Sequence, residues 1–163
     1  MSKELCVQIL RLAFGWTERK SRKAIKQSID SKAALNKFVE IVKAQGGNEK
    51  IVHNPALMKK AKYSVDIIAE ESGKVYKIDG EELGNACKLL GGGRIHKTDK
   101  IFHEVGIDMH TCLNKIVKKG EKLATVFFNN KVGVEEILHK IQKAIKIKEK
   151  APDTKYSLIY KIL

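Results

Sequence analysis

The sequence predicts an α+β protein in which three helices come first and a domain that mixes strands with helices follows from about residue 56. Two observations carry this prediction. Apolar residues recur with the 3.6-residue period of an amphipathic helix through the first 48 residues, whereas β-branched residues alternate with polar ones after Asn54-Pro55. The later elements do not repeat as strand, helix and strand, so a parallel sheet of βαβ type is not predicted.

The three predicted helices each carry an apolar stripe and an ordinary end signal. In the first, Leu5, Ile9 and Leu12 share one face, and Gly15 ends the helix. Thr17 is placed to cap the second. The third has the clearest stripe, closed by two glycines, and consists of Leu35, Phe38, Val39 and Val42. We expect these helices to form the side of a larger helical body, because the other two helices cannot cover the whole apolar stripe of each one.

The second part of the chain reads as short strands and two helices. Asp79 and Glu82 form a capping-box-like start for a helix that runs to about Leu90. Leu113-Asn114 is predicted to be a turn, and residues 134–145 a second helix. Strands are predicted at residues 63–69, 74–78, 105–109, 123–128 and 157–160.

Composition indicates a globular protein. Hydrophobic residues make up 43% of the 163 residues and only two prolines occur, which is enough apolar material for a packed core. The apolar runs are too short to cross a bilayer and the first residues lack a signal-peptide pattern, so we expect a cytoplasmic location. Cys6, Cys87 and Cys112 are widely spaced and odd in number, which predicts buried, reduced thiols.

The formal charge of +13 raises the question of nucleic-acid binding. The distribution of charge argues against it, because only four of the 32 basic residues are arginines and no recognition-helix, RRM, KH or zinc-finger pattern occurs. One true cluster is present, and at helical spacing it covers the outer face of the second helix: Arg19, Lys20, Arg22, Lys23 and Lys26. We therefore expect solvated helix faces, with no nucleic-acid or membrane partner.

One loop has a composition typical of anion binding. It consists of Gly91, Gly92, Gly93 and Arg94. Backbone N–H groups without side chains can approach an anion closely. Known phosphate cradles, however, place the glycines before a helix, whereas here they follow one and lack the GK[ST] or GxGxxG spacing. We interpret these four residues as a structural loop that ends the helix.

No residue pattern predicts catalysis, a metal site or a bound cofactor. The five histidines form no HxH or HxxxH pair, and no cysteine or carboxylate stands at ligand spacing around them. The carboxylate pairs are sequence neighbours that point in different directions, which favours solvated surface: Glu70-Glu71, Glu81-Glu82 and Glu135-Glu136. We accordingly assign no catalytic, substrate-binding or metal-binding residue.

Two stretches, residues 69–75 and 117–124, resemble the two halves of a biotinyl/lipoyl-type hammerhead sheet. Such a resemblance concerns the fold. A carrier domain would present its lysine in a Met-Lys-Met-like motif at a hairpin tip, and no such motif occurs. We therefore expect a hammerhead-type domain without a carried cofactor.

Several stretches, in this order, resemble the end of the pyrimidine-nucleoside (thymidine) phosphorylase family, and together they cover nearly the whole chain. Residues 35–48 are similar to the family's ALxKFxxxVxAQGGD segment. Residues 72–94, ending in Leu-Gly-Gly-Gly-Arg, are similar to SGYVxxIDxxxIGxAxxxLGAGR. Residues 105–107 and 117–124 are similar to AVGIxLxxxxGDxVxxGExLA. The chain departs from these patterns where Gly92 replaces an alanine, Phe102 an aspartate, and Asn114-Lys115 a Gly-Asp pair.

The resemblance implies a pentosyltransferase of nucleotide salvage, in which phosphate attacks the anomeric carbon of a pyrimidine nucleoside and releases the base and a (deoxy)ribose 1-phosphate. Residues 1–55 would close the family's α/β domain and residues 56–163 would form its carboxyl-terminal domain. The family's phosphate and base sites lie upstream of these segments. The chain alone is therefore expected to be inactive, and its partners are expected to be a second copy or a separate upstream half.

Two other interpretations stay open at this point. The chain could be a non-catalytic basic module that uses the face between Arg19 and Lys26. It could also be part of a nucleoside-monophosphate phosphorylase, since those enzymes are similar in this region.

Overall fold

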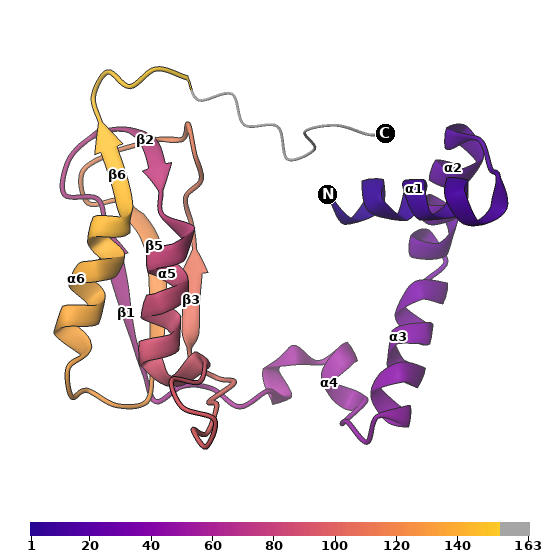
Figure 1. Ribbon diagram of the computed structural model, residues 1–163, viewed down its shortest axis with the longest axis horizontal. Coiled ribbons are helices and arrows are strands. Elements are labelled where there is room, and N and C mark those ends of the chain that lie inside the picture. Colours follow the sequence, from indigo (N-terminus) through magenta and orange to yellow (C-terminus); the bar gives the residue numbers. More distant parts are fainter. Residues whose placement is uncertain (154–163) are drawn as a thin grey trace. The chain divides into compact units, whose positions relative to one another are not determined.

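The computed structural model describes residues 1–153, and its chain divides into two compact units, one from Met1 to Leu57 and one that begins at Met58 (Figure 1). This break lies close to the boundary expected between residues 55 and 56. The described helices include none that is long and apolar enough to cross a membrane. The α+β class predicted from the sequence is confirmed, since helices and antiparallel sheets share the chain. The strand predicted at 157–160 lies outside the described residues.

The first unit contains the three predicted helices, α1 (Ser2–Phe14), α2 (Glu18–Asp30) and α3 (Ala33–Ala44). Gly15 ends α1 in the left-handed conformation, with φ 64°, and donates its N–H to the carbonyl of Arg11. Thr17 accepts the N–H of Lys20 and caps α2. A short α4 (Lys50–His53), which was not predicted, and a 3₁₀ turn (Pro55–Leu57) complete the unit.

The first unit buries very little of its apolar surface. Val7 and Ser21 are the buried residues between Met1 and Leu57, and α3 buries none. Leu5, Ile9 and Leu12, the predicted stripe of α1, are 54%, 61% and 87% exposed. A helical unit with so small a core gains stability from further contacts that cover its apolar faces. That it is the side of a larger body stays a prediction.

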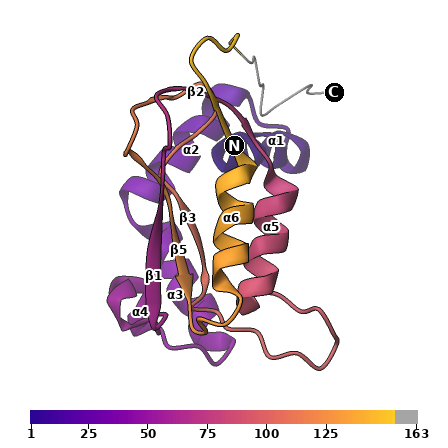
Figure 2. The same ribbon diagram turned by 90° about the vertical axis from the view of Figure 1, so that its left-hand side faces the viewer.

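The second unit is built on two three-stranded antiparallel sheets. One has the order β1–β5–β3, formed by β1 (Tyr63–Ile68), β5 (Lys122–Phe128) and β3 (Gly106–Met109). The other has the order β4–β2–β6, formed by β4 (Ile116–Val117), β2 (Gly73–Ile78) and β6 (Ile145–Lys148). Helices α5 (Gly80–Cys87) and α6 (Val134–Ala144) lie side by side on one face of the β1–β5–β3 sheet (Figure 2).

The main core lies between this sheet and the two helices. Leu123 and Val126 of β5, Val75 of β2 and Ile141 of α6 are fully buried. At about 25 cal/mol per Å² of apolar surface removed from water, burial of such side chains contributes about 1.5 to 3 kcal/mol each. Polar residues meet in register across all three strands of this sheet, where Asp66 of β1 and Asp108 of β3 both face Thr125 of β5.

The two stretches predicted to be related halves pair with each other. Ala69 donates its N–H to the carbonyl of Glu121, and Gly120 donates to the carbonyl of Ala69, both at 2.8 Å. Farther along, Gly73 of β2 faces Val117 of β4. Asn114 stands in the left-handed conformation, with φ 68°, at the predicted turn.

Two details of the second unit differ from the prediction. The helix expected at 134–145 ends at Ala144, because Ile145 already belongs to β6. Strands β4 and β6 were not predicted. In β6 the buried Ile145 and half-buried Ile147 alternate with exposed lysines, which is the period of two typical of a strand. This period is hard to recognise in the sequence, because the strand follows the last turn of α6 without a loop between them.

Candidate functional site

The glycine run closes α5 through a wide turn. After Cys87 the chain makes the π-helical turn η2 (Lys88–Gly92), inside which Gly91 has φ 94° and ψ 10°. The carbonyl of Gly91 accepts the N–H of Phe102 at 2.9 Å, so the loop between them closes back on the glycines. Only glycine adopts this backbone conformation without strain.

The glycines also allow close packing. A Cβ on Gly91 would lie 2.9 Å from the Phe102 ring, and one on Gly92 would lie 2.8 Å from the Cys87 sulfur. Arg94 is exposed and makes no ion pair with a described residue. These contacts give the glycines a steric role.

The other sequence candidates are dispersed. The described histidines, cysteines and carboxylates form no group that could hold a metal ion. All three cysteines are free thiols, but Cys6 and Cys112 are exposed, so the prediction of buried thiols is wrong for these two. Cys6 lies on the α1 face that lines an open hollow, and Cys112 lies in a loop just after β3.

The basic cluster of α2 is partly neutralised. Arg22 pairs with both Glu4 and Glu18 at 2.7 Å, and Lys26 pairs with Asp30. The hydrogen bond from Arg22 holds the pKa of Glu4 below its usual range. Arg22 thus ties α2 to α1, and the cluster is less available to a polyanion than its sequence indicates.

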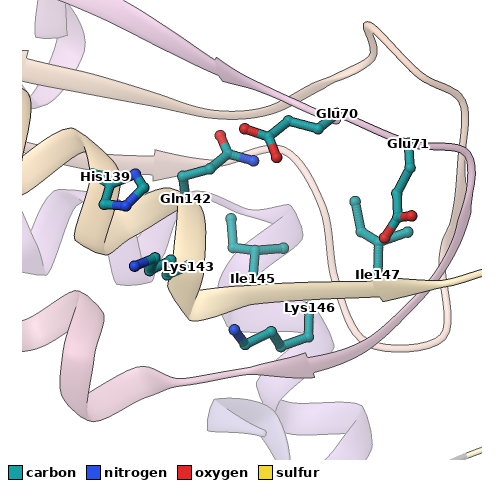
Figure 3. Close-up of a pocket in the computed structure, with 8 residues that line it drawn as sticks. All are labelled: Glu70, Glu71, His139, Gln142, Lys143, Ile145, Lys146 and Ile147. Atoms are coloured by element: carbon teal, nitrogen blue, oxygen red, sulfur yellow. The ribbon is translucent and has the colours of Figure 1, made fainter.

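A polar hollow of about 440 Å³ lies where α6 passes into β6 (Figure 3). Glu70 and Gln142 point toward each other across it, and Gln142 donates its side-chain N–H to the carbonyl of Ile68 at 3.2 Å. The remaining lining residues come from the β1–β2 turn, α6 and β6, and they are Glu71, His139, Lys143, Ile145, Lys146 and Ile147.

This hollow mixes carboxylates and lysines at an open surface. Its two glutamates and two lysines are all exposed, and none of them forms an ion pair with a described residue. An exposed, charge-balanced surface of this kind lacks the water exclusion and aligned donors that catalysis needs. Sequence reasoning missed His139 and Lys143, although their spacing of four residues on one helix places them on the same face.

A polar chain crosses the open face of the β1–β5–β3 sheet. Thr125 of β5 donates its hydroxyl to Asp66 of β1 at 2.7 Å, and His110 Nε2 lies 2.8 Å from the same hydroxyl. Lys122 pairs with Asp66 at 2.7 Å, and this contact, helped by Thr125, lowers the pKa of Asp66. Strand pairing alone brings these residues together, so no local sequence signal marks them.

Residues 74–148 match the family model described as the pyrimidine nucleoside phosphorylase C-terminal domain. The chain therefore contains a pyrimidine nucleoside phosphorylase C-terminal domain. The match begins in β2 and ends with β6, so it includes α5, α6 and the glycine run.

Pyrimidine-nucleoside phosphorylases are also among the curated proteins that the chain is similar to. The protein of Bacillus subtilis (strain 168) is 36% identical over 141 residues, which are 85% of this chain and 32% of that protein. The protein of Staphylococcus haemolyticus (strain JCSC1435) is 33% identical over 147 residues, which are 90% of this chain and 33% of that protein. The family resemblance inferred from the sequence is confirmed.

The chain spans about a third of the length of these pyrimidine-nucleoside phosphorylases. The matched domain contains the glycine run, most of the polar hollow and part of the sheet-face chain, namely His110, Lys122 and Thr125. None of these arrangements combines a buried nucleophile or base with an oriented partner, so no described residue is assigned to catalysis.

Proposed function

We propose that this chain is the carboxyl-terminal part of a pyrimidine-nucleoside phosphorylase, and that it works only when joined by the part that the family places before it. The complete enzyme would convert a pyrimidine nucleoside and phosphate to the free base and a (deoxy)ribose 1-phosphate. The observation that carries the proposal is the match to the family's carboxyl-terminal domain within a chain that spans a third of its relatives.

Each unit has its place in this proposal. The unit from Met1 to Leu57 would be the edge of the family's α/β domain, and the unit that begins at Met58 would be its carboxyl-terminal domain. The pairing of residues 69–73 with residues 117–121 supports a hammerhead-type arrangement for the second unit. A cytoplasmic location and a homodimer stay predictions.

The first unit offers the surface for the missing part. An apolar hollow of about 530 Å³ lies between α1 and α2, with Ile9, Trp16 and Ile25 in its lining. Elsewhere on α1, Leu12 and Phe14 are 87% and 63% exposed. A small α-helical unit with this much open apolar surface is stabilised by covering it, and the two-thirds of the relatives that this chain does not span would supply the cover.

Catalysis by the chain alone is not expected. Phosphorolysis requires donors aimed at the phosphate and at the charge that develops on the sugar, together with exact positioning of both substrates. The resemblance places the family's phosphate and base sites upstream of the segments that this chain matches, in the two-thirds of the relatives that it does not span. The basic-module alternative is weakened because Arg22 and Lys26 of α2 are ion-paired.

The test is a phosphorolysis assay with thymidine and uridine. The pure chain is expected to give no turnover, and addition of a polypeptide that corresponds to the first two-thirds of the Bacillus subtilis relative is expected to produce base and sugar phosphate. Turnover by the pure chain would refute the proposal that it works only when joined by the part that the family places before it. Activity of the pair on nucleoside monophosphates, but not on nucleosides, would favour the nucleoside-monophosphate phosphorylase alternative.

A matched pair of variants tests the surface. Leu12→Glu places a charge on the open face of α1 and is expected to abolish association with the added polypeptide on gel filtration. Lys37→Glu on α3 is the control, because Lys37 is exposed and, among the residues that the structure describes, its only ion pair is with Glu40 of the same helix. Equal association of wild type and Leu12→Glu would show that this face is not the interface.

A further inference from the structure

Three loops meet at one end of the second unit, at the bottom of that unit in Figure 1 and again in Figure 2. They comprise residues 58–62, 94–104 and 129–133, which we name the lysine end. Lys62 donates its backbone N–H to the Asn129 side chain at 2.9 Å, and Asn129 donates to Glu104 at 2.9 Å. Lys59 pairs with the same carboxylate at 2.5 Å. These bonds hold the three loops together.

Positive charge is concentrated in these loops. They contain seven lysines and arginines and two carboxylates, and both carboxylates are engaged. Asp99 accepts the backbone N–H groups of Ile95 and His96, and Glu104 is held by Lys59. The other six basic residues form no ion pair with a described residue, and they are Lys60, Lys62, Arg94, Lys97, Lys100 and Lys131.

Glu104 acts as the internal anchor of this surface. Its side chain is only 5% exposed, and hydrogen bonds led by the one from Lys59 lower its pKa from the ordinary 4.5 to about 2. The carboxylate therefore stays ionised at neutral pH and keeps Lys59 in place. It does not neutralise the outer lysines.

Two aromatic rings are placed among these cations. Lys131 Nζ lies 4.6 Å from the centre of the Tyr63 ring, and Lys100 Nζ lies 6.0 Å from the centre of the Phe102 ring. Tyr63 is 40% exposed and Phe102 is 36% exposed. Partly exposed rings with lysines over them supply both contacts that single-stranded nucleic acids use, because a base can take the place of the lysine on the ring while a phosphate contacts the displaced cation.

We propose that the lysine end binds single-stranded nucleic acid, with phosphates on Lys60, Lys62, Lys100 and Lys131 and bases stacked on Tyr63 and Phe102. The rings favour this partner over an acidic protein segment, which needs cations alone. A duplex is not favoured, because the lysine end consists of loops and presents no helix or two-stranded ribbon to a major groove. This proposal departs from the expectation of no nucleic-acid partner, which rested on the cluster of the second helix. The sequence did not reveal the lysine end, since its cations come from three separate segments.

The test is fluorescence anisotropy with a labelled single-stranded oligonucleotide of about ten nucleotides, which is within the site size of small binding folds. Four phosphate contacts predict a slope of about −3 for the logarithm of affinity against that of salt, or roughly a 50-fold loss between 50 and 200 mM salt. The variant with Lys60, Lys62, Lys100 and Lys131 changed to Gln is expected to lose this slope. A flat salt dependence in the wild-type chain would overturn the proposal.

The control removes four exposed lysines from the α6–β6 region, by changing Lys140, Lys143, Lys146 and Lys148 to Gln. Net charge is then the same in both variants. The control is expected to bind like wild type; an equal loss in both would show that total charge alone drives binding and would overturn the proposal. Circular dichroism spectra of both variants check that they are folded.

Two further binding experiments identify the partner. Tyr63→Leu keeps an apolar side chain but removes the ring, and it is expected to weaken binding about tenfold; unchanged affinity would overturn the stacking role. Equally tight binding of polyglutamate, or of vesicles that contain phosphatidylserine, at the same salt concentration would overturn the assignment to nucleic acid.

Discussion

Substitution of Gly91 by alanine tests the steric role of the glycine run. Gly91 has φ 94°, and its missing Cβ would lie 2.9 Å from Cδ2 of the Phe102 ring. Alanine at this position therefore destabilises the fold in two ways, through its strained backbone conformation and through the contact of its Cβ with Phe102. Gly84 is the matched control within α5, because a Cβ there meets no atom within 4 Å and the position is helical.

The free-energy costs of the backbone strain and of the steric contact can be estimated separately. A left-handed backbone costs a residue with a Cβ about 1 to 2 kcal/mol, and overpacking costs about 1 to 3 kcal/mol. Because the Phe102 ring is partly exposed, it can shift, which keeps the second penalty near its lower limit. We expect Gly91→Ala to lower the free energy of unfolding by about 2 to 3 kcal/mol and Gly84→Ala to raise it by about 0.5 to 1 kcal/mol.

The assay is urea unfolding of the whole chain followed by circular dichroism. With a slope of about 1 to 3 kcal/mol per M, Gly91→Ala shifts the midpoint down by on the order of 1 M. In a Phe102→Ala background the cost of Gly91→Ala should fall to the backbone part, about 1 to 2 kcal/mol. A midpoint for Gly91→Ala equal to that of wild type, or raised as in Gly84→Ala, would refute the reasoning.

Three other predictions concern stability and reactivity. Leu123→Ala is expected to lower the free energy of unfolding by about 2 to 5 kcal/mol, because the side chain is fully buried, whereas Leu12→Ala, at 87% exposure, should change it by less than about 0.5 kcal/mol; equal effects in urea unfolding would contradict the assigned core. Since the pKa of Glu104 is lowered to about 2, its carboxylate stabilises the fold above the ordinary 4.5 and loses that contribution as the pH falls toward 2. In urea midpoints measured over this range, Glu104→Gln should therefore remove part of the acid-induced decline, and an unchanged pH profile would be evidence against the Lys59–Glu104 contact. The exposed Cys6 and Cys112 should react with a thiol reagent faster than the half-buried Cys87, and a reversed order would contradict the described exposures.

The elements with local signals were predictable from the sequence. Gly15 ends α1 in the left-handed conformation, and the Thr17 side chain caps the first turn of α2, both as predicted. Asp79 accepts the N–H of Glu82 and begins α5. In each case the deciding contact lies within four residues, so the sequence contains the whole signal.

Features that depend on distant contacts were not predictable in this way. Strand β4 has only two residues, and it is a strand because Gly73 faces Val117 across the sheet. The chain of Asp66, Thr125 and His110 joins three segments through strand pairing. The buried anchor Glu104 likewise reads as an ordinary surface glutamate until Lys59 and Asn129 are seen beside it.

The central claim is that this chain completes a pyrimidine-nucleoside phosphorylase that its own residues cannot form. The most direct measurement is the initial rate of thymidine phosphorolysis as the chain is titrated into a fixed amount of the polypeptide that corresponds to the first two-thirds of the Bacillus subtilis relative. The account predicts no rate for either component alone and a rate that saturates at equimolar chain. Phosphorolysis by the chain alone, or a mixture that associates and stays inactive, would contradict it.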